Sequence, residues 1–335
     1  MGGTAIQGVR RYAAAEFYAA QSEIMKILRD LFPDVRFHAV RSYGDKQSFG
    51  DLDIVFDTSQ MPGGWRTMLE VEIRPSDVVR NGPVTSMAYK DLQVDFIGAQ
   101  PEEYDIACAY FDYNDMGNLL GRLARSVGLK FGSMGLMLPV VISKHTKPEL
   151  LVTRDMQKIL EVLGLDYFTY QQGFPNLNSI FEFVTSSKLF SPLSFDLSLR
   201  TSKDRTRDVT RPTYMAFLQY VKEHKMPHGE HVAKAKDYSW VLGHLVRTVP
   251  SFCRTLADAN DEWEAFKLYD SRFGRRAVST LLNITGPALG AVMQALRSDL
   301  PELYALAEQG SKEDCEQLIK STYKEYQDGQ QEKGS

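Results

Sequence analysis

Residues 41–56 read RSYGDKQSFGDLDIVF, a polar, glycine-containing loop that leads into a hydrophobic strand. Asp51 and Asp53 stand at the mouth of this strand. Because side chains alternate along a strand, residues i and i+2 share a face, so the two carboxylates are predicted to project together. A third acid, Asp95, lies within a second β-like run at residues 92–97. The apolar residues of that run fall on its opposite face: Leu92, Val94 and Phe96.

Three carboxylates on neighbouring strands predict a site for divalent cations. Oxygen ligands of this kind suit Mg²⁺ or Mn²⁺. Two such ions, about 4 Å apart, can lower the pKa of an attacking hydroxyl and neutralise a leaving pyrophosphate in an in-line displacement. The simpler interpretation is that Gly50-Asp51 forms a turn before an ordinary strand and that Asp95 is a surface acid. The third acid weakens that interpretation without removing it.

The rest of the chain predicts an α+β fold, with a small mixed sheet that carries helices and is followed by a mostly helical region. The predicted N-terminal domain spans residues 1–170. Its expected helices are residues 9–32, 116–127 and 154–163, and its expected strands are residues 36–42, 52–56, 68–73 and 92–97. A segment rich in Gly, Pro, Asn and Ser, residues 171–192, is expected to connect to the second domain.

The second predicted domain, residues 171–328, holds the substrate, and residues 329–335 form a polar, disordered tail. Apolar periodicity predicts helices near residues 214–225, 240–249, 263–273, 287–296 and 313–326.

Composition narrows the class of protein. The chain has 335 residues, of which 43% are hydrophobic and 24% charged, with a net charge of −4. This excludes wholesale disorder, and no apolar run reaches the roughly 18 residues of a membrane span. The start of the chain lacks the apolar core of a signal peptide. The three cysteines are widely spaced and suggest neither a disulfide framework nor a zinc knuckle, so a cytoplasmic location is expected.

The element Ser42…Gly50-Asp51-Leu52-Asp53 resembles the signature of the polymerase-beta-like nucleotidyltransferase superfamily. Residues 101–132 are similar to the palm of family X DNA polymerases, including a Tyr-Phe pair and the Asn and Arg of the next helix. Residues 151–160 look like the short thumb helix that closes that palm. The resemblance covers roughly residues 10–170.

The resemblance implies a role for each matched residue. Asp51 and Asp53 would bind both metal ions, and Asp95 would bind the catalytic ion and help to activate the primer 3′-hydroxyl. Ser42 would hydrogen-bond the terminal phosphates of the nucleotide, for which Lys46 or Arg41 would supply charge. The implied nucleotide site also includes Gly50. Tyr110 and Phe111 would pack against the sugar, and Asn118 and Arg122 would lie near the base and the template.

Simpler interpretations of these four residues remain open: core packing for Tyr110 and Phe111, and a solvated helix face for Asn118 and Arg122.

The chain also departs from the family pattern. Arg41-Ser42 stands where the family has Gly-Ser, and Gly44-Asp45-Lys46 replaces a pair of arginines, which puts the grip on the triphosphate in question. Asp112-Tyr113 stands where the family has Thr-Gly, so discrimination between ribose and deoxyribose is also in question. No lyase domain precedes the palm, so classical gap-filling repair is not expected.

A basic stretch in the second half predicts binding of nucleic acid. Residues 199–254 contain eleven Lys and Arg against five Asp and Glu, with aromatic residues interleaved. Cations for phosphates and aromatic rings for stacking are typical of nucleic-acid grooves, although a charged helical face over buried aromatics has the same composition. The predicted contacts are Arg200, Lys203, Arg205, Arg207 and Arg211. Residues 284–296 are also weakly similar to the tail helices of tRNA CCA-adding enzymes.

The leading hypothesis is therefore a nucleotidyltransferase that uses two Mg²⁺ or Mn²⁺ ions. It would add nucleoside monophosphates from an NTP or dNTP to a 3′-hydroxyl of DNA, RNA or tRNA and release pyrophosphate. One alternative is transfer to a hydroxyl of a small molecule or a protein. A second is a non-catalytic, nucleic-acid-binding pseudoenzyme.

Overall fold

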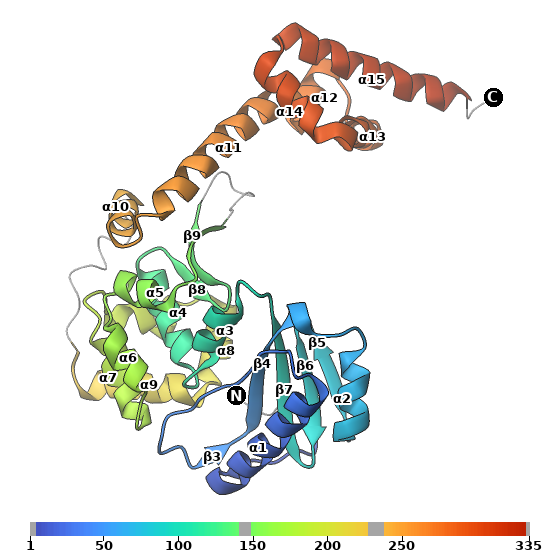
Figure 1. Cartoon of the computed structure of the whole chain (residues 1–335). Coiled ribbons are helices and arrows are strands. Elements are labelled where there is room, and N and C mark those ends of the chain that lie inside the picture. Colours follow the sequence, from blue (N-terminus) through green and yellow to red (C-terminus); the bar gives the residue numbers. More distant parts are fainter. Residues whose placement is uncertain (1–4, 141–148, 227–237, 333–335) are drawn as a thin grey trace. The chain divides into compact units, whose positions relative to one another are not determined.

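A computed structural model describes residues 5–140, 149–226 and 238–332 and has the predicted α+β fold (Figure 1). A mixed five-stranded sheet with helices is followed by a largely helical C-terminal region. The chain divides into two compact units, Met1–Phe252 and Cys253–Ser335.

The main sheet of the first unit has the strand order β2-β4-β7-β6-β5. Its strands are β2 (Phe37–Ala39), β4 (Asp51–Asp57), β7 (Leu92–Ala99), β6 (Val84–Tyr89) and β5 (Val78–Asn81). β4 and β7 are parallel, and the other neighbours are antiparallel. The central parallel pair is made of the two segments in which the sequence places the acids.

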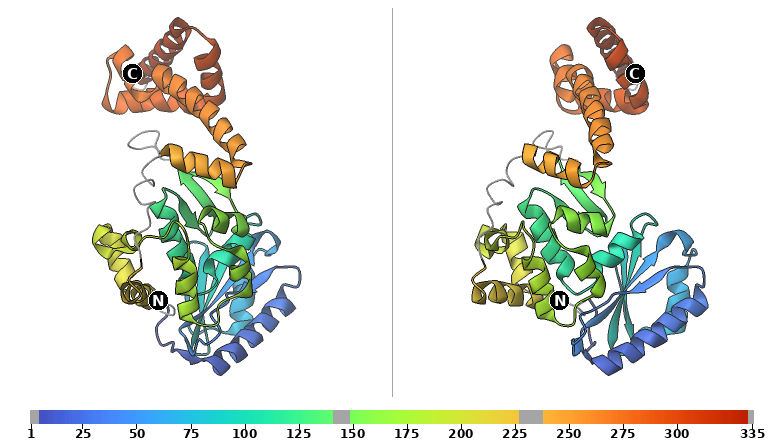
Figure 2. Two further views of the ribbon diagram at one scale, coloured as in Figure 1. Left: turned by 90° about the vertical axis from the view of Figure 1, so that its left-hand side faces the viewer. Right: turned by 60° about the vertical axis from the view of Figure 1, so that its left-hand side comes forward.

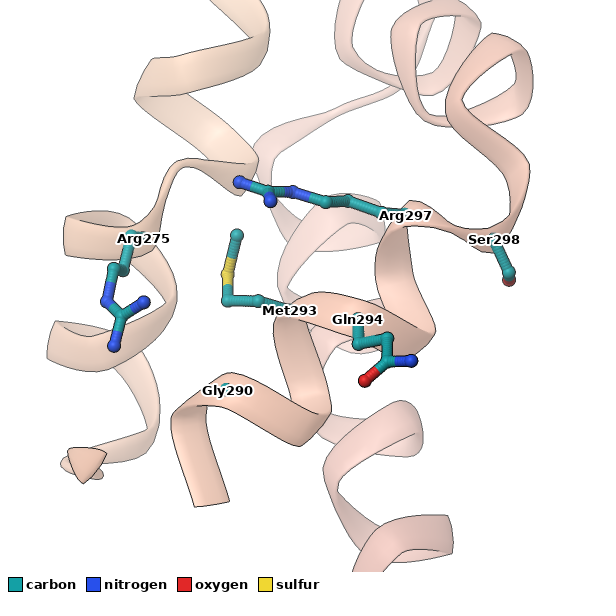
Figure 3. Close-up of a pocket in the computed structure, with 6 residues that line it drawn as sticks. All are labelled: Arg275, Gly290, Met293, Gln294, Arg297 and Ser298. Atoms are coloured by element: carbon teal, nitrogen blue, oxygen red, sulfur yellow. The ribbon is translucent and has the colours of Figure 1, made fainter. Parts of the chain in front are cut away.

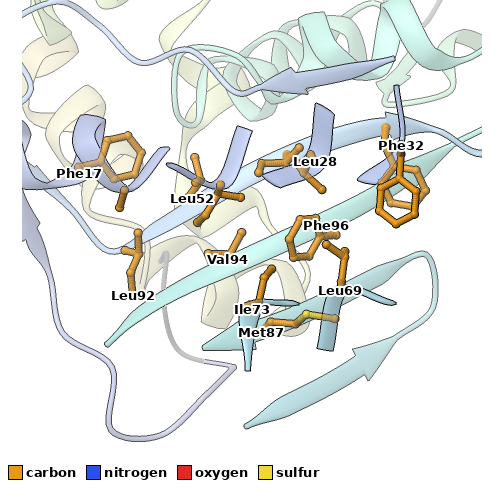
Figure 4. Packing of buried hydrophobic residues seen from close by; sticks show 14 of the residues in the cluster. Phe17, Leu28, Phe32, Leu52, Leu69, Ile73, Met87, Leu92, Val94 and Phe96 are labelled. Atoms are coloured by element: carbon orange, nitrogen blue, oxygen red, sulfur yellow. The ribbon is translucent and has the colours of Figure 1, made fainter. Parts of the chain in front are cut away.

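Helices cover both faces of this sheet (Figure 2). α1 (Ala14–Leu31) and α2 (Trp65–Ile73) pack on one face over the large core shown in Figure 4. In β4 and β7 that core takes the even-numbered residues Leu52, Ile54, Phe56, Leu92, Val94 and Phe96. α3 (Tyr104–Phe111) packs on the other face, against Val55 and Ile97. The odd-numbered residues of β4 and β7, including all three acids, therefore lie on the α3 side.

The first unit also contains two small sheets and seven further α-helices among its described residues. In one sheet β1 (Tyr12–Ala13) pairs with β3 (Ser48–Phe49). The other is antiparallel and contains β8 (Lys130–Gly132), β9 (Gly135–Pro139) and β10 (Glu149–Thr153). The helices are α4 (Met116–Ser126), α5 (Met156–Val162), α6 (Tyr167–Gln172), α7 (Leu177–Thr185), α8 (Ser202–Val209), α9 (Pro212–Glu223) and α10 (Tyr238–Thr248).

Several local predictions differ from the structure. The helix predicted at residues 9–32 begins only at Ala14, because Tyr12 and Ala13 pair with β3. Residues 68–73, predicted as a strand, belong to α2, because Trp65, Leu69 and Ile73 recur at four-residue intervals and form its buried face. The predicted connection at residues 171–192 contains α7, which begins with a capping box between Asn176 and Ser179.

The boundary predicted between residues 170 and 171 falls inside the first compact unit. Contacts across it explain why: α4 packs on α7 and on the short 3-10 helix η2 (Pro192–Phe195), and Arg122 of α4 pairs with Asp208 of α8. The two compact units are divided between Phe252 and Cys253.

The second unit is helical and has its own core. It contains α11 (Phe252–Phe273), α12 (Arg275–Leu282), α13 (Gly286–Leu296), the 3-10 helix η5 (Arg297–Asp299), α14 (Leu300–Gln309) and α15 (Lys312–Glu332). Its buried cluster extends from Tyr269 to Ile319. α15 continues through residues 329–332, which were predicted to be tail. Among the residues that the structure describes, no helix is both long and apolar enough to cross a bilayer.

Candidate metal site

The parallel pairing of β4 with β7 brings three acids together. Asp53 lies directly opposite Asp95 in the strand register, and Asp51 lies opposite Gln93. A carboxylate oxygen of each of Asp51, Asp53 and Asp95 lies within 4.8 Å of the others. Three oxygen donors at this spacing fit a hard divalent cation such as Mg²⁺ or Mn²⁺. The acids lie together on one face of the sheet, as predicted, and are partly buried.

Neighbouring polar side chains orient Asp95. The amide of Gln93 donates to both carboxylate oxygens of Asp95, over 2.9 and 3.0 Å, and the Ser86 hydroxyl on β6 also hydrogen-bonds Asp95. The side-chain Oε1 of Gln93 accepts from the backbone N–H groups of Ala5 and Ile6, which holds its amide nitrogen toward Asp95. Gln93 was not predicted as a site residue, although its position two residues before Asp95 on a strand was a usable signal.

The site disfavours negative charge when no cation is present. Burial, together with the charges of Asp51 and Asp95, raises the pKa of Asp53 well above its normal value. Burial is also the main cause of the raised pKa of Asp95, followed by the charge of Asp51, while the hydrogen bonds from Ser86 and Gln93 act in the opposite direction. A bound cation would relieve the electrostatic repulsion among these three carboxylates.

Lys46 is a cation whose charge interacts with the acids. The charges of Asp51, Asp53 and Asp115 all act on it, and its ammonium donates to the Asn114 side chain over 3.1 Å. Burial lowers the pKa of Lys46 in spite of these acidic neighbours. The lysine thus connects the acids of β4 with the start of α4.

The loop that carries Ser42 and Lys46 is held by the helical part of the unit. The N–H groups of Gly44 and Asp45 donate to the carbonyls of Phe174 and Pro175, each over 2.9 Å. The close approach favours glycine, since a Cβ at Gly44 would lie only 3.0 Å from the Pro175 oxygen.

Asp112 supports the start of the same loop. It is buried and accepts from the backbone N–H and the guanidinium of Arg41, both over 2.7 Å, and it also pairs with His38 over 2.8 Å. Asp112 was predicted only as a departure from the family pattern. Its structural role here is to orient Arg41.

Ser42 and Lys46 line different pockets. One pocket, of about 660 Å³, lies beside Lys46, and its other lining residues are Arg11, Tyr43, Asp45, Gln47, Ser48, Asn176, Leu177 and Asn178. The other pocket, of about 310 Å³, contains Ser42, Gly44, Tyr18 and Arg41 among its lining residues. Gly50 is buried and immediately precedes β4.

Tyr110 and Phe111 have packing roles. Phe111 packs against the cluster on the α3 face of the sheet, and the Tyr110 ring makes an edge contact with Phe131 of β8. The Tyr110 backbone also touches α4 so closely that a Cβ at Gly117 would lie 2.1 Å from the Tyr110 oxygen. Neither residue lines the two pockets beside the loop.

Asn118 and Arg122 do not lie on a solvated helix face. Arg122 is 3% exposed, and its guanidinium donates to Asp208 over 2.7 Å. The Asn118 amide nitrogen is buried and has no hydrogen-bond partner within the described part of the chain. Arg122 therefore joins α4 to α8, whereas Asn118 retains an unused donor.

The basic stretch is largely engaged in internal ion pairs. Arg200 and Arg207 lie 3.9 and 3.8 Å from Asp208, and Arg207 also contacts Asp204. Arg211 donates to Asp115 over 2.8 Å. Lys203 and Arg205 are exposed on α8. The five residues predicted to contact nucleic acid thus lie in one region of the fold, but three of them pair with acids.

Comparison of the sequence with models of known protein families finds no match. A comparison with curated proteins finds none either. The assignment of a function therefore depends on the geometry of the site.

Proposed function

We propose that the protein is a metal-dependent nucleotidyltransferase that transfers a nucleoside monophosphate from an NTP or dNTP to a 3′-hydroxyl of a nucleic acid. The observation that carries this proposal is the juxtaposition of Asp51, Asp53 and Asp95, together with Lys46, whose charge interacts with Asp51 and Asp53 and which also lines a polar pocket. When bound at the triad, Mg²⁺ or Mn²⁺ ions would supply charge stabilisation for the attacking hydroxyl and the leaving pyrophosphate.

The chain's own residues then have separate tasks. Asp51, Asp53 and Asp95 would hold the cation, and Asp95 also accepts the proton of the acceptor hydroxyl at a carboxylate oxygen that Gln93 orients. The bond between the acceptor oxygen and the α-phosphorus forms while the bond from the α-phosphorus to the bridging oxygen breaks. Lys46 offers an ammonium to the departing phosphates, and the pocket of about 660 Å³ beside it has a volume typical of small-molecule sites.

The test is transfer of a labelled nucleotide. Wild-type protein is incubated with Mg²⁺ or Mn²⁺ and each labelled NTP and dNTP, in the presence of primer-template DNA, single-stranded RNA or tRNA. We expect an extended acceptor with wild type and none with Asp53→Asn. Asp34→Asn is the matched control, because Asp34 is an exposed acid of the same unit outside the triad. Equal extension by wild type and Asp53→Asn would contradict the proposal.

One observation favours a second candidate, transfer to a hydroxyl of a small molecule or a protein. Arg200, Arg207 and Arg211 are paired with acids, which leaves fewer cations on the predicted nucleic-acid surface. Nucleotide consumption that depends on the triad but extends no nucleic acid would select this candidate. Nucleotide binding without any turnover would instead indicate a pseudoenzyme.

A further inference from the structure

The second unit contains a pocket of about 500 Å³ that the proposed chemistry does not use. Three elements form it: the start of α12, one side of α13 and the 3-10 helix η5. Figure 3 shows Arg275 on one side and Arg297 extending over Met293 from the other. The full lining is Arg275, Gly290, Met293, Gln294, Arg297 and Ser298.

Both arginines of this pocket are exposed, and neither side chain has an ion pair or hydrogen bond within the described residues. This differs from the basic stretch of the first unit, where Arg200 and Arg211 are paired with Asp208 and Asp115. The side chains of Arg275 and Arg297 are therefore free to bind a ligand.

The positive charge of the pocket is local. Residues 253–335 contain fourteen Asp and Glu against ten Lys and Arg, yet no carboxylate lines the pocket. The adjacent acid, Asp299, caps α14 by accepting from the backbone N–H of Glu302 over 3.1 Å. An anion thus meets two guanidinium groups in a unit whose overall charge is negative, which favours a specific contact over diffuse attraction.

The pocket is also shaped for a ligand larger than one anion. Gly290 leaves the surface of α13 open, since a Cβ built there would have no atom within 4 Å. Met293 is nearly buried and forms an apolar part of the lining, while Gln294 and Ser298 are exposed and can hydrogen-bond. Two arginines on opposite sides of a broad, open pocket suit successive phosphates of a chain, because each guanidinium can bind one phosphate bidentately.

We propose that this pocket binds the phosphodiester backbone of a nucleic-acid strand, with Arg275 and Arg297 on its phosphates. The proposal rests on the proposed function in naming the strand as the acceptor. In this proposal the unpaired Arg275 and Arg297 of the second unit make the main contact with nucleic acid, and the paired arginines of residues 200–211 do not.

The experiment measures binding of a labelled single-stranded oligonucleotide to the full chain by fluorescence anisotropy over a range of salt concentrations. Arg275→Gln/Arg297→Gln is expected to weaken binding by about tenfold or more and to reduce the slope of log K against log salt by roughly 1.4, or about 0.7 for each lost phosphate contact. Arg276→Gln is the matched control: Arg276 is the adjacent exposed arginine of α12 and does not line the pocket. It is expected to bind like wild type.

Two results would overturn the proposal: unchanged binding by the double variant, or an equal loss with Arg276→Gln. Inorganic phosphate and pyrophosphate serve as competitors. If either displaces the oligonucleotide at a concentration matched in phosphate, the pocket is a site for free anions and the proposal of a strand is wrong.

Failure of this proposal is separable from failure of the proposed function. Asp53→Asn is expected to retain oligonucleotide binding and to lose nucleotide transfer. If wild type transfers nucleotides but the double variant binds normally, only the pocket proposal fails. If binding depends on Arg275 and Arg297 but no nucleotide is ever transferred to any acceptor, only the enzymatic proposal fails.

Discussion

At the scale of single residues, Asp53 is a proposed cation ligand whose negative charge is unfavourable when no cation is bound. Its charge is opposed by burial and by Asp51 and Asp95, which raise its pKa. Asp53→Asn removes this repulsion, so we expect the variant to melt at a higher temperature than wild type without metal. A gain of about 1 kcal/mol corresponds to roughly 2–4 °C for a unit of this size.

The same variant is expected to lose stabilisation by metal. Adding Mn²⁺ at a hundredfold excess over its dissociation constant should stabilise wild type by about 2.7 kcal/mol and leave Asp53→Asn unchanged. Thermal unfolding with and without Mn²⁺ checks both effects, and Asp34→Asn should behave as wild type. A Mn²⁺-dependent rise in the melting temperature of Asp53→Asn would contradict the assignment of the site.

Asp57, at the end of the same strand, gives a prediction about pH. Burial favours its neutral form, but hydrogen bonds from Arg36 over 2.7 Å and from Ser59 over 2.9 Å outweigh burial and lower the pKa of Asp57. A carboxylate with a lowered pKa in the folded state stabilises the protein above its unfolded pKa of about 3.9, and this contribution is lost as the pH falls through the folded value.

Asp57→Asn is therefore expected to cost about 1–3 kcal/mol at neutral pH. The difference from wild type should shrink below about pH 3.9 and vanish once the pH is below the folded pKa. Urea unfolding of both proteins at several pH values measures this, and a difference that does not change with pH would refute the explanation.

At the scale of elements, the contact between α4 and α8 depends on a buried ion pair. Arg122 is 3% exposed and Asp208 is fully buried. Asp208→Asn leaves the Arg122 charge without its carboxylate, which typically costs about 3–5 kcal/mol. Arg122→Met/Asp208→Leu removes both charges and is expected to cost less than Asp208→Asn alone. Urea unfolding of the two variants decides this; a double variant that is less stable than the single one would disprove it.

Helices and strands could be predicted from the sequence where the pattern of apolar residues within the segment is sufficient. The strands at Asp51–Asp57 and Leu92–Ala99 were found because their apolar residues alternate over a buried face. α2 was mistaken for a strand because its short run contains Val71 and Ile73, and the exposure of Val71 is evident only from the fold.

The sequence predicted that the three acids lie together, but it predicted only part of their surroundings. The triad follows from period-two patterns within two strands. The pairing of Arg122 with Asp208 joins residues 86 positions apart, and no local pattern reports a contact of that kind. The same reason explains why Arg211 looked free in the sequence, since its partner Asp115 lies 96 positions away, just before α4.

At the scale of the whole molecule, two units with separate cores should unfold in two steps. The core of the second unit draws only on residues of that unit, from Tyr269 to Ile319. Leu303→Ala, at a position 3% exposed, is expected to destabilise this unit by about 2–5 kcal/mol. Calorimetry should show one transition lowered by Leu303→Ala and the other raised by Mn²⁺. A single transition that responds to both would contradict the independence of the units.

The parallel pairing of β4 with β7 has a consequence for folding kinetics. Parallel neighbours need a long crossover, so Asp53 and Asp95 meet only after the chain between them has closed a loop, an event with an entropic cost that slows folding. A cation then finds its full set of ligands only in a nearly complete sheet. We therefore expect a cation bound by the triad to slow unfolding without accelerating folding, because its binding energy would be gained after the rate-limiting step.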